Sequence, residues 1–112
     1  MKKRDFADYI NDIIESCQDI LVFTKGFSPE KFIKDKKTMN AVIRSLEVIG
    51  EASKKVPEDI KRKYSKIPWK QMAGMRDKLI HEYFGVDKEM VWQVIEKHIP
   101  SILPLVKKIP HK

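Results

Sequence analysis

The feature that most constrains the fold of this chain is a helical spacing of apolar residues along most of its length. Between residues 6 and 21 the apolar side chains recur every three or four positions, with acidic and amide residues between them. Similar stripes run from about Lys37 to Lys55, from near Pro68 to Gly85, and from Asp87 onward. No segment alternates apolar and polar residues as a half-buried strand does. The sequence therefore predicts an all-α protein.

Glycine, proline and capping residues predict where the helices begin and end. Gly26 is expected to end the first helix, and Ser28 to cap a short one that follows. Pro100 and Pro104 are expected to kink or break the last helix, because proline lacks an N–H and clashes with the preceding turn. Short connections make consecutive helices antiparallel, so we expect a four- to five-helix up-down bundle in one domain over residues 1–112.

The charge of the chain is unevenly distributed. The net charge is +7, and residues 54–70 contain seven basic side chains against two acidic ones. Such a surface favours RNA, DNA or an acidic protein. The alternative is a solvated lysine-rich face that only keeps the protein soluble.

The remaining composition excludes several classes of protein. Cys17 is the only cysteine, falls on the apolar stripe of the first helix and is expected to be buried. A disulfide framework and a Cys/His zinc site are therefore not predicted. The basic start is followed at once by an acidic residue, which argues against a signal peptide, and no apolar run is long enough to span a membrane. We expect a cytoplasmic protein with no membrane association.

Arg76, His81 and Tyr83 form an R-x4-H-x-Y pattern near the end of the third long helix. On an ideal helix Arg76 and Tyr83 lie within roughly 20° of one line, whereas His81 lies roughly 140° from Arg76 and in line with Asp77. One copy of the chain therefore does not direct all three groups at one point. Two copies related by a two-fold axis could bring them together in a shared groove, which favours a dimer.

These residue types suit cleavage of RNA, in which the 2′-hydroxyl attacks the adjacent phosphorus. Histidine can act as base or acid near neutral pH, and arginine can clamp the phosphate. No metal or other cofactor is required, and the H-E-x-x-H zinc pattern is absent. The alternative is structural, because arginine and histidine near a helix C-terminus also complement the helix dipole. His98 falls on the apolar side of the last helix and is expected in the core or an interface.

Several blocks resemble the HepT-like family of HEPN-domain proteins. They are I-G-E-A at residues 49–52, I-P-W at 67–69, G-x-R-D-x-x-x-H-x-Y-F at 74–84, V-W at 91–92 and I-P at 99–100. The resemblance implies a helical bundle that dimerises with its R-x4-H motifs in a cleft between the two copies. It also implies the toxin of a prokaryotic HepT/MntA toxin–antitoxin pair with metal-independent ribonuclease activity.

The resemblance implies roles for four residues. Arg76 and His81 would be the catalytic pair, and Asp77 would support them at the polar position after the arginine. Tyr83 would be the tyrosine that the nucleotidyltransferase antitoxin modifies with AMP. The implied partners are an RNA substrate, an MntA-like antitoxin and a second copy of the chain, with a larger hetero-oligomer possible. A non-catalytic helical module that binds a nucleotidyltransferase or a nucleotide is the alternative.

Overall fold

All the regular secondary structure in the part that the structure describes is helical. The computed structural model describes residues 5–81 and 88–112, of which 76–81 are described by their backbone only. The elements are α1 (Phe6–Phe23), α2 (Pro29–Lys34), α3 (Lys36–Lys55), α4 (Glu58–Lys63), α5 (Trp69–His81), α6 (Lys88–Gln93), the π-helical segment η2 (Val94–His98) and α7 (Ile99–Val106). No strand occurs within these residues, which confirms the all-α prediction.

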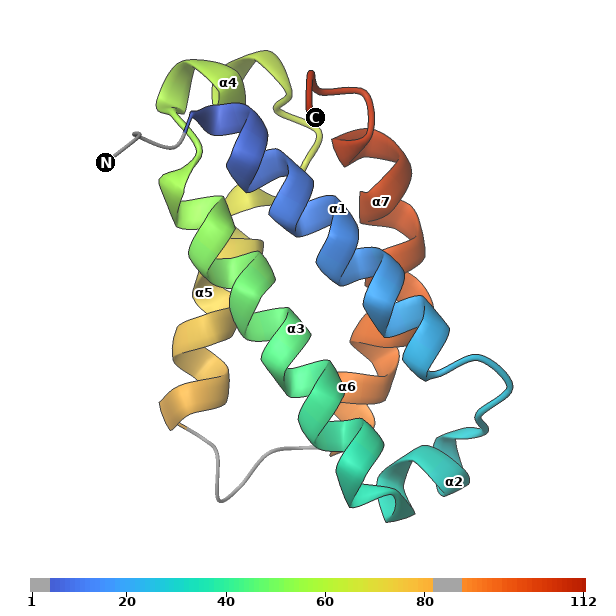
Figure 1. Ribbon diagram of the computed structural model, residues 1–112. Helices are drawn as coiled ribbons and strands as arrows, with labels where there is room; N and C mark the ends of the chain where they lie inside the picture. Colours follow the sequence, from blue (N-terminus) through green and yellow to red (C-terminus); the bar gives the residue numbers. More distant parts are fainter. Residues whose placement is uncertain (1–4, 82–87) are drawn as a thin grey trace.

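Four long helical segments form an up-and-down bundle (Figure 1). Helix α3 packs against both α1 and α5, and α7 packs against α1. The elements α6, η2 and α7 follow one another without a break and make the fourth long segment. The short helices α2 and α4 lie at opposite ends of the bundle (Figure 1). None of the described helices is both long and apolar enough to span a membrane.

One apolar cluster, supplied mainly by α1, α3 and the last helical segment, forms the core. The side chains of Ile13, Ile20, Phe32, Leu46 and Ile49 are at most 1% exposed. Burying a side chain of this size stabilises the fold by about 1.5–3 kcal/mol. The buried hydroxyl of Ser53 donates a hydrogen bond of 2.7 Å to the carbonyl of Ile49, so this polar group is satisfied inside the core.

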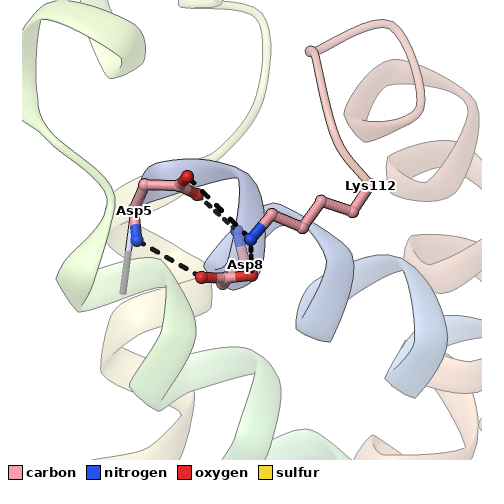
Figure 2. A network of polar contacts seen from close by, with 3 residues as sticks. All are labelled: Asp5, Asp8 and Lys112. Atoms are coloured by element: carbon pink, nitrogen blue, oxygen red, sulfur yellow. Dashed lines mark hydrogen bonds and ion pairs between the residues drawn. The ribbon is translucent and has the colours of Figure 1, made fainter. Parts of the chain in front are cut away.

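Three charged residues tie the start of α1 to the C-terminal tail (Figure 2). The carboxylate of Asp5 accepts the Asp8 N–H at 3.2 Å, and that of Asp8 accepts the Asp5 N–H at 3.3 Å. The two carboxylates repel each other, and Lys112 offsets this repulsion with its Nζ 2.6 Å from Asp8 and 3.9 Å from Asp5. Because the lysine side chain is 58% exposed, the ion pairs contribute no more than about 1 kcal/mol.

The connection after α1 differs slightly from the sequence prediction. The helix ends at Phe23, three residues before Gly26, and the hydroxyl of Thr24 donates to the carbonyl of Ile20 at 2.7 Å. Gly26 adopts φ +79°, the left-handed region that a glycine tolerates best. Gly26 therefore shapes the turn rather than the helix end itself, and Ser28 caps α2 as predicted.

The two prolines of the last segment do not break it. Pro100 lies in the first turn of α7, directly after the π-helical residues, and Pro104 lies inside α7, which continues to Val106. In an α-helix the ring of Pro100 would clash with the carbonyl of Glu96. The wider π turn at η2, where the N–H of Ile99 bonds to the carbonyl of Val94, coincides with this position and relieves the clash.

Cys17 is fully buried, as the sequence predicts. Burial raises the pKa of its thiol from 9.0 to about 12, because the apolar interior disfavours the thiolate. The native state therefore keeps a proton that the unfolded chain releases above about pH 9, so this thiol lowers stability as the pH rises past that point.

We predict that Cys17 reacts with Ellman's reagent about three orders of magnitude more slowly in the native protein than in guanidinium chloride. The thiolate is the reacting species, and the rise in pKa lowers its population by that factor. Absorbance at about pH 8 follows both reactions. Equal rates in the native and unfolded protein would show that the thiol is accessible.

Candidate functional site

Helix α5 carries the predicted functional residues, and its N-terminal half is anchored in the fold. Trp69 begins the helix, is 7% exposed and donates its indole N–H to the carbonyl of Tyr64 at 3.1 Å. Met72, one turn later, is 1% exposed. Since α3 also packs against this helix, the direction of α5 is fixed by its neighbours.

The C-terminal half of α5 carries the predicted catalytic positions. The backbone is helical through His81, so Arg76, Asp77 and His81 all lie on α5. Tyr83 lies outside the described residues. On a regular helix Arg76 and His81 are about 7 Å apart along the axis and roughly 140° apart round it, while Asp77 and His81 lie within roughly 40°. One copy of α5 therefore places the arginine and the histidine on different faces.

An apolar groove lies beside the predicted motif, between α5 and the last helical segment. Its volume is about 430 Å³, and its lining includes Met72, Met75, Met90 and His98. We call it the methionine groove. Methionine side chains are flexible and polarisable and adapt readily to a partner surface. This groove is not visible in the sequence, because its two walls come from helices distant in the sequence.

His98 is exposed, so its predicted place in the core is wrong. It ends the π-helical segment, where the wider turn changes the phase of the residues that follow. Its position on the methionine groove leaves an interface role as a prediction.

Gly74 lies on α5 between the anchored half and the motif, and it is exposed. A Cβ built at this position would meet no atom within 4 Å. Glycine inside a helix is about 1 kcal/mol less favourable than alanine, and nothing in the described part of this chain requires it here. The glycine also lines the methionine groove. Its small size therefore suits the close approach of a second molecule.

No group of three or more His, Cys, Asp or Glu side chains suited to a metal ion occurs among the residues that the structure describes. This finding does not extend to the side chains of Arg76, Asp77 and His81.

Comparison with known proteins gives consistent similarities over nearly the whole chain. A family model described as "Ribonuclease HepT-like" matches residues 13–109. The chain is 50% identical over 107 residues to a probable ribonuclease HepT of Thermococcus cleftensis, covering 96% of this chain and 97% of that protein. It is 52% and 48% identical over 109 residues to two candidate RNases of Methanocaldococcus jannaschii, covering 97% of this chain and 90% of each relative. No solved structure matches it.

Proposed function

Because this chain belongs to the HepT-like family of ribonucleases, we propose that it is a metal-independent endoribonuclease and the toxin of a prokaryotic toxin–antitoxin pair. The observation that carries the proposal is that the family match spans the whole of α5. This helix is anchored by Trp69 and holds Arg76 and His81 at the R-x4-H spacing.

In the proposed reaction the RNA supplies its own nucleophile. The 2′-oxygen forms a bond to phosphorus and the bond from phosphorus to O5′ breaks, which leaves a cyclic phosphate and a 5′-hydroxyl. His81 would take the proton of the 2′-hydroxyl in one copy and protonate the departing O5′ in the other, since both forms of imidazole exist near neutral pH. Arg76 would bind the non-bridging oxygens and stabilise the charge of the transition state.

Asp77 would act as a positioning residue for His81. It lies four residues earlier on the same side of α5, where side chains of a regular helix are neighbours. Its carboxylate would accept the N–H of the imidazole and hold the ring in one tautomer. The same pairing would keep the negative charge of Asp77 away from the RNA.

A two-fold dimer would complete the site. One copy separates Arg76 and His81 by roughly 140°, so a groove containing both needs a second copy of α5. The methionine groove and the open position at Gly74 support a close contact beside the motif. The site would then lie in the cleft between the two copies.

We further propose that a nucleotidyltransferase antitoxin of the MntA type controls the toxin by attaching AMP to Tyr83. The tyrosine follows His81 by two residues, so a group attached there would lie near the motif. The added phosphate would compete for Arg76 and repel the RNA backbone. Assembly with the antitoxin would give a larger hetero-oligomer.

The dimer can be tested at Gly74. The wild-type protein should be a dimer at micromolar concentration by light scattering. Gly74→Ala should stabilise the folded chain by about 0.5–1 kcal/mol, because alanine favours the helix and has room here, yet it should weaken the dimer. Asn40→Ala, at an exposed site on α3, is the control that gains helix propensity without affecting assembly. A monomeric wild-type protein would contradict the dimer.

Catalysis can be tested at the motif. His81→Ala and Arg76→Ala should each abolish RNA cleavage and growth inhibition, with little change in helical circular dichroism or Tm. His111→Ala, in the exposed tail, should remain active, and EDTA should not inhibit. If the wild-type chain cleaves no RNA but copurifies with the nucleotidyltransferase, the non-catalytic binding module is the better description.

Modification can be tested by intact-mass spectrometry after coexpression with the adjacent nucleotidyltransferase. The chain should gain one or more AMP units that map to Tyr83, and Tyr83→Phe should gain none. The modified protein should lose ribonuclease activity, because the phosphate occupies the site of the RNA phosphate. Inhibition without any mass change would mean that the antitoxin acts by binding alone.

A further inference from the structure

A basic groove lies where α4 leads into α5. Its volume is about 900 Å³, and four basic side chains line it against the single carboxylate of Glu58. The basic residues are Lys61, Arg62, Lys66 and Lys70. We call this hollow the cationic groove.

Most of the positive charge in this groove is not neutralised by the protein. The Nζ of Lys61 lies 3.7 Å from a carboxylate oxygen of Glu58, so this lysine is partly compensated. Arg62, Lys66 and Lys70 are exposed and form no ion pair with any side chain that the structure describes. Three like charges in one hollow repel each other and favour an anion in their midst.

The position of these charges is not explained by helix stability alone. Arg62 lies in the last turn of α4, where a cation complements the helix dipole. Lys66 lies in the connector between the helices, and Lys70 lies in the first turn of α5, where a cation is unfavourable and no acidic residue compensates it. The basic residues are therefore distributed along the groove and not at the positions that the helix dipoles favour.

The groove has a fixed floor. Ile67 and Trp69 are 3% and 7% exposed, and the indole hydrogen bond to the carbonyl of Tyr64 fixes the connector against α5. A second hollow of about 210 Å³ continues past Lys66 and is lined by Lys63 and Lys108. The basic surface therefore extends to both sides of the connector.

The groove leads along α5 towards the motif. Lys70 and His81 are eleven residues apart, which places them about 16 Å apart along the axis and within roughly 20° of one line. Ala73, which lines the groove, precedes Arg76 by three residues and is its neighbour on the helix surface. A polyanion held in the groove can therefore reach the motif of one copy at His81 or at Arg76, which lie on different faces of α5.

We propose that the cationic groove binds the phosphates of single-stranded RNA and guides the strand to Arg76 and His81. This inference rests on the proposed ribonuclease function. The substrate must then contain an unpaired stretch that extends about 16 Å from the cleaved bond. A flexible single strand can bend round the corner between α4 and α5, as a rigid duplex cannot. Proteins bind such strands through basic grooves that follow the backbone.

The test is a salt titration of RNA binding in the full chain carrying His81→Ala, which would prevent cleavage. The ligand is a fluorescein-labelled oligouridine of about 20 nucleotides, followed by anisotropy between about 50 and 200 mM KCl. Adding Arg62→Gln, Lys66→Gln and Lys70→Gln should weaken binding at least about tenfold and lower the slope of log K against log salt by about 2, or about 0.7 for each lost phosphate contact. Circular dichroism checks the fold, and the single variant Lys70→Gln should lower the slope by about 0.7 if the triple variant unfolds.

The matched control removes the same charge elsewhere. Lys25→Gln, Lys34→Gln and Lys36→Gln lie at exposed sites on α2 and the segments beside it, at the opposite end of the bundle from α4, and should leave the slope unchanged. Equal losses in the two triple variants would show that net charge alone binds RNA and would overturn the groove. The proposal would also be overturned if duplex RNA bound as tightly as the single strand. It would likewise be overturned if the groove variants lost only the binding of an acidic protein partner. Cleavage by the chain with His81 intact tests the ribonuclease function separately.

Discussion

The packing of α3 against both α1 and α5 is the constraint on which the rest of this structure depends. Leu46 and Ile49 are fully buried on α3, and Gly50, Ala52 and Ser53 are buried on its last turns. Among the α5 side chains that the structure describes, only Trp69 and Met72 are buried. Helix α5 therefore depends on α3 and its own first turn for its position, and any shift of α3 would move the predicted catalytic residues with α5.

This arrangement separates the anchored part of α5 from the part that carries the predicted motif. The first turn of α5 anchors the helix, and the predicted motif follows after the exposed Gly74. The two hollows on either side of α5 differ in character, since one is lined by methionines and the other by lysines and arginine. A partner copy and an RNA strand would therefore contact neighbouring surfaces, which share Pro68 and Gln71 and meet at the motif.

Most of the fold could be predicted from the sequence, because the stripes of apolar residues on α1 and α3 are long and regular. The cap that Ser28 forms on α2 and the burial of Cys17 follow from local chemistry, and both predictions are confirmed. The error at His98 arose because the sequence pattern assumes a uniform α-helical turn, whereas η2 is wider. A local change of pitch depends on how a segment packs and on the prolines that follow, so apolar spacing does not reveal it.

The candidate site was predicted less completely. The pattern of Arg76 and His81 is visible in the sequence, and their separation on one helix follows from its pitch. The methionine groove depends on packing between α5 and the last helical segment, so no local pattern indicates it. The cationic groove lies within residues 58–73 and coincides with the excess of basic residues that the sequence shows. Gly74 is the sequence feature that could have indicated the methionine groove. A glycine inside a helix lowers the stability of the helix, so its presence indicates a place where a side chain would obstruct a contact.

The π-helical segment has a consequence for comparing this chain with related proteins. A π turn is equivalent to an α-helix into which one residue has been inserted, so it turns the register of everything after it by roughly 100°. An alignment to a relative with an uninterrupted α-helix would need a single-residue gap within Val94–His98. Without that gap, the buried positions of α7, including Ile99, Ile102 and Val106, would be matched to solvent-facing positions of the relative.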